Sequence, residues 1–529
     1  AGMTGSAVSG LFTRPWILEA GMSDMTLKDC FGNTFLKHRD KKAVTFLQNG
    51  GVATEMTYGQ VERESNRAAN MFREMGVGQG DRVILYFGKS LCFVIAHMGL
   101  QKVGATAVPL NPGFKPSEMA YFLEDADPVL VLAETGRGSM LKGLRPGVQV
   151  LEIDPQRPYQ ELELFRYYPD ISQEVQTGPD DPGLIIYTSG TTGQPKGAVL
   201  TQRNLVHDAR NIIKIWEIAK TDVLCHALPF FHVHGLCFAL HTCLMAGGHA
   251  LLLDQFVPET VAEVLADRER FGCNVFMAVP AMYSKLLAYA ADRDLDFSHV
   301  RLWTSGSAPL LPKDFVRIKE VFGKEPVERE GMSETGMNFS NPVRGVRKPG
   351  SIGLPLPGLE VRLVDPVTFQ DVPPGEEGEI WLRGPGITPG YWQKPRETAQ
   401  AFEQGWFRTG DLGRIDKNGY YYLTDRIKHI IISGGENISP KEIEGIINQL
   451  DQVQDSSVVG LADDRWGEKV AAAVVVKPGA DLDPDIVKAH CKKHLHDWKC
   501  PKAVAFVPDL PKNSMGKVLK EDVKALFHD

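Results

Sequence analysis

The first third of the chain alternates short apolar runs with segments of helical spacing, and this alternation restricts the fold more than any other feature. The runs at 82–87, 105–110 and 129–133 are strand-like, and apolar residues recur at helical intervals in the segments between them. Strands that alternate with helices form a parallel sheet whose faces the helices cover. The same texture returns between 224 and 303, so the sequence predicts a second, similar α/β layer.

The rest of the chain changes in texture twice. From 358 to 422, short alternating strands are separated by Gly and Pro, which favours a small antiparallel or barrel-like unit. The residues after Lys428 have the pattern of a separate small α+β domain. We therefore expect an α/β protein, with a large N-terminal domain of two similar αβ-layered subdomains and a barrel-like subdomain, followed by a small α+β C-terminal domain.

Size and composition exclude several classes of protein. The chain has 529 residues, which suits two to four domains of roughly 100–200 residues each. Its 58 basic and 66 acidic residues give a net charge of −8, which argues against a nucleic-acid surface or a polybasic membrane anchor as its main role. No apolar run reaches the ~18 residues that span a bilayer, and the first residues lack the layout of a signal peptide. We expect a cytoplasmic protein whose eight scattered cysteines are reduced.

A loop rich in glycine and hydroxyl groups, YTSGTTGQPKG at 187–197, follows the apolar run at 184–186. Its glycines allow the backbone to wrap closely around an anion, Ser189, Thr191 and Thr192 supply hydroxyl donors, and Lys196 supplies positive charge. The loop differs from a Walker motif because Gly197, and not Ser or Thr, follows the lysine. Its composition predicts a cradle for a polyphosphate.

With the residues after it, this loop resembles the signature of the adenylate-forming superfamily, which includes acyl-CoA synthetases, luciferases and the adenylation domains of peptide synthetases. Eight further motifs occur in the family's order. They are LPFFH (228–232), SGSAPL (305–310), GMSET (331–335), YWQKP (391–395), GWFRTGDLG (405–413), DRIK (425–428), SGGENISPKEIE (433–444) and PKNSMGK (511–517). The resemblance covers nearly the whole chain and implies an AMP-binding domain over residues 1–426, a mobile C-terminal domain over 429–529 and a hinge near Lys428.

The resemblance also implies a reaction in two halves. A carboxylate attacks the α-phosphate of ATP and releases pyrophosphate, and the thiol of coenzyme A then takes the acyl group while AMP leaves. ATP, Mg²⁺ and coenzyme A are the implied cofactor and co-substrates. The family's nucleotide-contacting positions correspond here to Thr188, Ser189, Gly190, Thr191, Thr192, Gly193, Lys196, Gly331, Met332, Ser333, Asp411 and Arg426.

Other positions carry roles that the family implies residue by residue. Glu334 matches the magnesium ligand, with Thr192 beside it, and Asp411 matches the acid that accepts both ribose hydroxyls. Lys517 matches the lysine that reaches the reacting carboxylate and the α-phosphate. Gly434 and Gly435 match a pair that approaches the pantetheine tunnel during the second half-reaction.

The acid substrate is less constrained. The segments PFFHVHGL, VRLWTSGSAPLL and GMSETGMNFSNP look like malonyl-CoA synthetases, and His232 matches a residue that lines the acyl pocket. A second carboxylate would need a cation or several donors, for which Arg301 and His234 are candidates, with Ser305, Gly306 and Met337 as pocket residues. Arg301 could equally be structural. Apolar residues such as Phe238, Met277 and Trp303 could line a pocket for a monocarboxylate or simply form core, so the acid is a short dicarboxylate or a short or medium-chain fatty acid.

One position departs from the family pattern. Glu330 stands where the family usually has an aromatic residue that stacks on adenine, and a carboxylate cannot stack. We expect that Glu330→Tyr tightens ATP binding or leaves it unchanged.

Two alternatives to the ligase stay open: an adenylating enzyme that loads a carrier protein, and an inactive nucleotide binder. The stretch 490–500 holds five His and Cys residues, but their spacing matches no standard zinc module and also fits an amphipathic helix. The expected partners are small molecules and not nucleic acid, and the chain could be a monomer or a homodimer.

Overall fold

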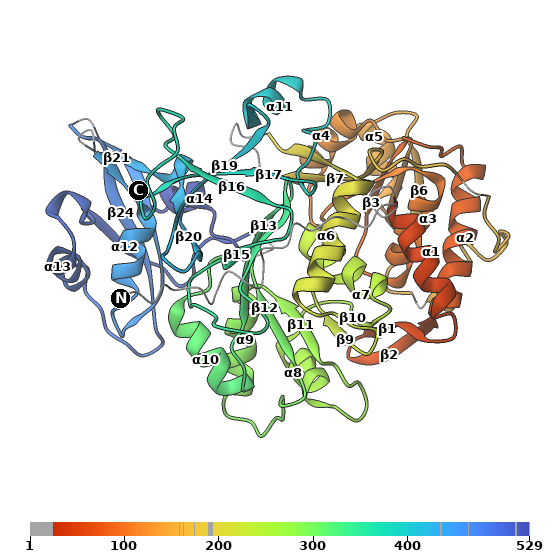
Figure 1. Cartoon of the computed structure of the whole chain (residues 1–529), viewed down its shortest axis with the longest axis horizontal. Coiled ribbons are helices and arrows are strands. Elements are labelled where there is room, and N and C mark those ends of the chain that lie inside the picture. The colour runs from red at the N-terminus through yellow and green to blue at the C-terminus, as the bar shows by residue number, and fades with distance from the viewer. Residues whose placement is uncertain are drawn as a thin grey trace, which may run out of the picture.

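The computed structural model describes residues 25–157, 159–161, 163–173, 175–188, 194–433, 436–463, 465–513 and 516–527. Within these residues the strands form four sheets. In Figure 1 the first third of the chain, in red and orange, forms one end of the molecule, and the C-terminal elements, in blue, form the other. The middle of the chain lies between them.

The first expected α/β layer is a six-stranded sheet in the order β6-β5-β3-β4-β7-β8. Its strands are β3 (Arg82–Tyr86), β4 (Thr106–Pro109), β5 (Leu130–Glu134), β6 (Gln149–Ile153), β7 (Pro182–Thr188) and β8 (Lys196–Thr201). The helices α3 (Leu91–Val103), α4 (Pro116–Ala126) and α5 (Gly138–Leu144) connect them. All neighbouring strands are parallel except β7 and β8, which are antiparallel. The alternation in the sequence predicted β3 to β5 and their helices to within about two residues of these bounds.

The second layer is a nine-stranded sheet in the order β15-β14-β13-β12-β11-β9-β10-β1-β2. Its strands are β1 (Lys42–Gln48), β2 (Gly51–Thr57), β9 (Val223–His226), β10 (His249–Leu253), β11 (Val275–Ala278), β12 (Leu302–Ser305), β13 (Val327–Met332), β14 (Gly336–Ser340) and β15 (Leu354–Pro355). The hairpin of β1 and β2 joins this sheet because β1 pairs in parallel with β10, about 200 residues later in the chain. The sequence patterns did not predict this link.

The helices between and around the two sheets build one continuous core. They are α1 (Leu27–Lys37), α2 (Tyr58–Glu74), α6 (Gln202–Ile215), the π-helix η2 (His234–His241), α7 (Thr242–Met245), α8 (Pro258–Ala266), α9 (Pro280–Ala290) and α10 (Pro312–Phe322). Strand β3 contributes Val83 and Leu85 to this core, while Ile84 and Tyr86 pack on its other face in a second core. Successive side chains of a strand face opposite ways, so β3 is covered on both faces, as a parallel strand requires.

Helix α3 shows how the local sequence fixes an element. The hydroxyl of Ser90 accepts a hydrogen bond from the backbone N–H of Phe93, which caps the first turn. Gly104 ends the helix with a φ of 72°, a left-handed conformation that glycine adopts without strain. The helix is buried on almost every side, and His97 contacts His241 of η2 through ring nitrogens 2.9 Å apart. The contact ties the first layer to the second.

The barrel-like unit is a five-stranded antiparallel sheet. It consists of β16 (Glu360–Val364), β17 (Gly378–Arg383), β18 (Phe402–Glu403), β19 (Trp406–Ile415) and β20 (Tyr421–Arg426), with α11 (Pro395–Ala401) before β18. The single turn η3 (Ile427–His429) leads from β20 to the C-terminal unit.

The C-terminal unit has the expected α+β composition. Its elements are β21 (Ile431–Ser433), β22 (Glu436–Ile438), α12 (Pro440–Ile447), β23 (Val453–Asp463), β24 (Gly467–Val476), α13 (Pro484–His494), β25 (Ala503–Phe506) and α14 (Lys520–Ala525). The His- and Cys-rich stretch begins in α13, as the helical alternative predicted, and Cys491 and Cys500 are buried in the core of this unit. Among the described residues, no helix combines the length and apolar composition that crossing a bilayer requires.

Candidate active site

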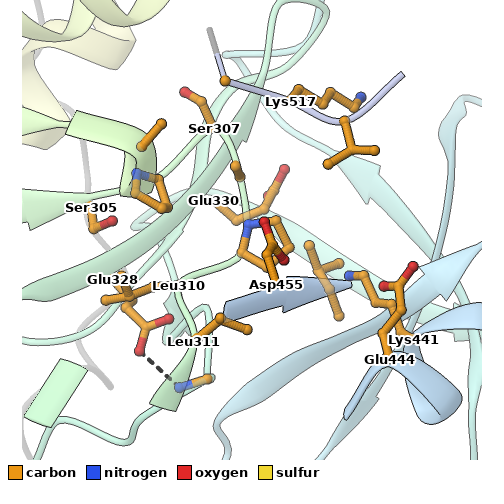
Figure 2. Close-up of a pocket in the computed structure, with 18 of the residues that line it drawn as sticks. Ser305, Ser307, Leu310, Leu311, Glu328, Glu330, Lys441, Glu444, Asp455 and Lys517 are labelled. Carbon is orange, nitrogen blue, oxygen red and sulfur yellow. Dashed lines mark hydrogen bonds between the residues drawn. The ribbon is translucent and has the colours of Figure 1, made fainter. Parts of the chain in front are cut away.

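A cavity with a volume of about 360 Å³ lies where β11, β12 and β13 end. Ligands of open α/β sheets bind at this carboxyl end of parallel strands. One wall comes from residues 305–311 and 328–331, a second from β19 and β20, and a third from the C-terminal unit, including Lys441 and Lys517 (Figure 2). Three parts of the chain that are far apart in the sequence therefore meet in one cavity.

The phosphate-cradle prediction lies mostly outside the described residues, because Ser189, Gly190, Thr191, Thr192 and Gly193 are not among them. The two ends of the loop are described. Thr188 closes β7, Lys196 opens β8, and the two residues pair across the antiparallel strands. The ammonium of Lys196 lies 5.3 Å from the centre of the Tyr391 ring.

Glu334 is held between two hydroxyl groups and is only 7% exposed. The hydroxyl of Thr188 donates to its carboxylate at 3.2 Å, and the hydroxyl of Tyr391 donates at 3.1 Å. A carboxylate flanked by hydroxyl oxygens is the hard donor set that Mg²⁺ prefers. The sequence analysis quoted the YWQKP motif but assigned Tyr391 no role, and the structure shows that this residue orients Glu334.

Asp411 and Arg426 form an ion pair between neighbouring positions of β19 and β20. The Nε atom of Arg426 lies 2.7 Å from the carboxylate of Asp411, which is 5% exposed. Both residues line the cavity, as their predicted nucleotide contacts require. The ion pair orients the carboxylate and leaves its remaining lone pairs for a ligand.

Lys517 reaches the same cavity from the C-terminal unit. Gly516 packs so closely on Ala281 that an added Cβ atom would lie 2.6 Å from the methyl group of Ala281. Burial lowers the pKa of Lys517 to about 8, with the positive charge of Arg426 acting in the same direction and the charges of Asp411 and Glu334 opposing it. Lys517, Asp411 and Arg426, three residues that the motifs had predicted at one site, therefore line one cavity, and the charge of Glu334, the fourth, acts on Lys517.

Glu330 faces the cavity one residue before Gly331. The side-chain amide of Asn338 donates to its carboxylate at 3.1 Å. Burial, reinforced by the nearby charge of Asp411, raises the pKa of Glu330 to about 7. A carboxyl group that is partly protonated at neutral pH therefore stands at the position of the usual aromatic residue.

The other residues of the GMSET motif shape the end of β13. An added Cβ atom on Gly331 would lie 2.5 Å from the carbonyl oxygen of Gly336, so only glycine fits there. Met332 ends β13 and Ser333 follows it in the turn, and both are half-buried. Gly434 and Gly435, the predicted pantetheine pair, lie outside the described residues.

Of the predicted acid-binding residues, Ser305 lines the cavity, whereas His232, His234 and Met337 do not. Ser305 lines the cavity with a buried hydroxyl that has no hydrogen-bond partner among the described residues, and Gly306 follows it. His234 is buried behind Ser307, whose hydroxyl lies 3.3 Å from its Nδ1 atom. Burial lowers the pKa of His234 far below its usual value and that of His232 to about 4, so both rings are neutral hydrogen-bonding groups and not cations. Met337 packs into the main core and does not line this cavity.

Arg301 is corrected as a substrate-binding residue. Its Nε atom donates to the carboxylate of Asp222 at 2.8 Å, and its Nη atoms bond the carbonyl groups of Trp216 and Glu217 and the same carboxylate. The guanidinium is therefore already bonded within the protein, and Arg301 does not line the cavity. The structural alternative that the sequence left open is the one observed.

Arg329 is the cation that the sequence analysis missed. It lines the cavity, is 3% exposed, and its Nε and Nη1 atoms have no hydrogen-bond partner among the described residues. Its Nη2 atom donates a long hydrogen bond of 3.5 Å to the hydroxyl of Ser307. The residue directly precedes Glu330 in the sequence, but an arginine in a strand carries no signal that distinguishes a ligand-facing group from a paired one.

Comparison with known proteins agrees with this geometry. Residues 32–392 match the family described as AMP-binding enzyme, and residues 442–517 match the AMP-binding enzyme C-terminal domain. The feruloyl-CoA synthase of an Amycolatopsis species is 34% identical over 91% of this chain and 96% of that protein. The mitochondrial malonate–CoA ligase of Xenopus laevis is 33% identical over 85% of this chain and 83% of that protein.

Among solved structures, ATP-bound MatB from Rhodopseudomonas palustris matches with a TM-score of 0.89 and 34% identity, covering 96% of this chain and 99% of that one. The match extends over both the large N-terminal part and the C-terminal unit. The chain belongs to the family of AMP-binding enzymes and, within it, to the AMP-forming carboxylate–CoA ligases.

Proposed function

We propose that the acid activated by this ligase is a short dicarboxylate of the malonate type. The observation that carries the proposal is the buried guanidinium of Arg329, a residue that lines the cavity and whose Nε and Nη1 atoms have no hydrogen-bond partner among the described residues. Burying a charge without an acceptor is costly, and a carboxylate of the ligand would supply the missing acceptor in bidentate geometry. The substrate's other carboxylate would remain free to react with ATP.

The acidic groups around Arg329 do not fully neutralise its positive charge. The acidic groups whose charges act on it are Glu330 and Asp208. Burial raises the pKa of both carboxyl groups to about 7, so neither is fully ionised at neutral pH. Burial also lowers the pKa of Arg329, but only to about 10, and the guanidinium stays protonated. Phe238 lies beneath it, with the ring centre 5.1 Å from the guanidinium carbon.

The nucleotide end of the cavity supports the first half-reaction. Lys196 and Lys517 would neutralise charge on the phosphates, and Asp411 would accept the ribose hydroxyls. Glu334 and the loop residue Thr192 would hold Mg²⁺, which would neutralise the phosphate oxygens when bound. Glu334 is already oriented for this by the hydroxyl groups of Thr188 and Tyr391.

The second half-reaction requires Lys517 to leave. We propose that the C-terminal unit rotates about a hinge at Lys428, which lies in the single turn η3 between β20 and β21. The rotation would withdraw Lys517 and bring Gly434 and Gly435 towards the thiol of coenzyme A.

A panel of acids tests the dicarboxylate proposal. The purified enzyme is assayed for acid-dependent AMP release with malonate, succinate, butyrate and octanoate, each with and without coenzyme A. We expect kcat/KM for malonate to exceed that for butyrate by at least about 100-fold, because a monocarboxylate leaves Arg329 unpaired. Equal or better turnover of butyrate or octanoate would overturn the dicarboxylate proposal, and AMP release without coenzyme A would indicate another acyl acceptor.

A further inference from the structure

Lys441 is a second cation that the C-terminal unit directs into the nucleotide cavity. It is the second residue of α12, and its backbone N–H donates to the carboxylate of Asp425 at 3.1 Å. Its side chain leaves the helix beside Glu444 and extends towards the middle of the cavity, which it lines together with Lys517 (Figure 2). No motif or comparison assigned this residue a role.

The ammonium of Lys441 forms no hydrogen bond or ion pair with any described residue. The carboxylates around it already have other donors. Lys520 binds Glu444, and the hydroxyl of Ser439 donates to Asp425 at 2.6 Å. The ion pair with Arg426 at 2.7 Å occupies Asp411. Lys441 is therefore not needed to neutralise these acids, although their charges oppose the lowering of its pKa by burial.

We propose that Lys441 is a nucleotide-binding residue that donates a hydrogen bond to a ribose hydroxyl oxygen of ATP. The proposal rests on the proposed assignment of Asp411 to the ribose. A ribose hydroxyl that donates to Asp411 still has free lone pairs on its oxygen, and these need a donor. Arg426 is already engaged with Asp411, and Lys517 is assigned above to the phosphates, so among the described cations that line this cavity Lys441 is still available as a donor.

The contact would exist only while the C-terminal unit is packed as it is here. Lys441 and Lys517 belong to the same unit, and two further contacts hold that unit against the large domain. Lys313 donates to the carbonyl group of Gln454 at 2.9 Å, and Gly516 packs on Ala281. If the unit rotates before coenzyme A reacts, Lys441 leaves the ribose together with Lys517. Lys441 should therefore assist adenylation and not thioester formation.

Kinetics of the two half-reactions test the proposal. The variants are Lys441→Met, Lys441→Arg and, as a matched control on an exposed lysine of the same unit, Lys492→Met. KM is measured for ATP, 2′-deoxyATP and 3′-deoxyATP in pyrophosphate release, with whichever acid the wild type turns over. Thioester formation is measured separately from preformed acyl-adenylate and coenzyme A.

We expect Lys441→Met to raise KM for ATP by about 10-fold, the worth of one hydrogen bond from a charged donor. The preference for ATP over one of the two deoxy analogues should fall by the same factor, Lys441→Arg should restore part of it, and thioester formation should stay unchanged. An unchanged KM for ATP, an equal rise for all three nucleotides, or an equal loss in both half-reactions would overturn the proposal. The KM for the acid is the readout of Arg329, so failure of the dicarboxylate proposal would leave this result interpretable.

Discussion

A Cβ atom on Gly306 would lie 2.5 Å from the Nε atom of Arg329, so the absence of a side chain at Gly306 makes room for the guanidinium. Gly306 directly follows β12, and Arg329 lies on the neighbouring strand β13. The glycine of the SGSAPL motif thus shapes the surroundings of Arg329 through a contact that the sequence alone does not show.

Replacing Gly306 tests this contact. Gly306→Ala should push the flexible end of Arg329 aside and raise KM for the dicarboxylate by about 10-fold or more, since a misplaced guanidinium loses its bidentate geometry. KM is measured at a temperature where the variant is folded, because the clash falls on a buried side chain. Gly143→Ala, in α5 with open space around it, is the control and should leave KM unchanged and Tm unchanged or slightly higher, because alanine favours a helix. An unaltered KM in Gly306→Ala would contradict the proposed role of Arg329.

Arg301 should behave as a structural residue. Asp222 is buried, and burial alone would raise its pKa. Hydrogen bonds from Arg301, from the backbone of Ala219 and from Asn274 outweigh burial, so the pKa of Asp222 is lowered in the folded protein. Removal of Arg301 leaves this buried carboxylate without its cation. We expect Arg301→Gln to lower the free energy of unfolding by about 2–4 kcal/mol, as measured by urea unfolding. The KM for the acid should stay within about twofold of the wild type at a temperature where the variant is folded. A specific rise in that KM with normal stability would return Arg301 to the list of substrate-binding residues.

The pH dependence of adenylation should report the lysine that the C-terminal unit supplies. The pKa of Lys517 in the free enzyme is lowered to about 8, so its charge is lost as the pH rises through that value. Because kcat/KM reports the free enzyme, kcat/KM for ATP should fall above about pH 8 in pyrophosphate release and stay flat in thioester formation from acyl-adenylate. Lys517→Arg should remove the fall from this pH range, whatever its lower rate. A wild-type profile that stays level up to about pH 10 would contradict the assignment.

Glu330 should reduce stability at alkaline pH. Its pKa is about 7 in the folded protein and about 4.3 in an unfolded chain, so the folded state binds the extra proton between these values and stability falls as the pH rises from about 4.3 to 7. Glu330→Gln removes this loss. We expect the variant to have a higher Tm than the wild type at pH 8 and a similar Tm at pH 4.5, measured by scanning calorimetry. A lower Tm at pH 8 would show that the ionised carboxylate has a stabilising partner.

The sequence predicted more of the nucleotide site than of the acid site, and the reason is physical. Glu334, Asp411, Arg426 and Lys517 stand in motifs whose resemblance to the family implied that they meet. In the structure Asp411, Arg426 and Lys517 line one cavity, and the charge of Glu334 acts on Lys517. Arg301 and Arg329 each stand in or beside a strand and look alike in the sequence. What separates them is a partner far away in the chain: Asp222 lies 79 residues before Arg301, and no acidic residue in the described part of the chain pairs with Arg329 in this way.

The fold shows the same division between local and long-range information. The alternation of strands and helices is local, so the elements from β3 to β5 were predicted from it. The parallel pairing of β1 with β10 is long-range and depends on which sheet has a free edge, which periodicity does not encode. Tyr391 was likewise visible in a motif, while its bond to Glu334 depends on two segments 57 residues apart.

The most direct test of the central claim is the ratio of kcat/KM for malonate to that for butyrate in the wild type and in Arg329→Met. The substitution replaces a buried cation by an apolar side chain of similar length, so the protein should still fold. The account predicts that the ratio falls by at least about 100-fold in the variant, because only malonate loses a charged partner worth about 2–5 kcal/mol. An unchanged ratio, with both acids affected equally, would contradict the claim that Arg329 recognises a second carboxylate.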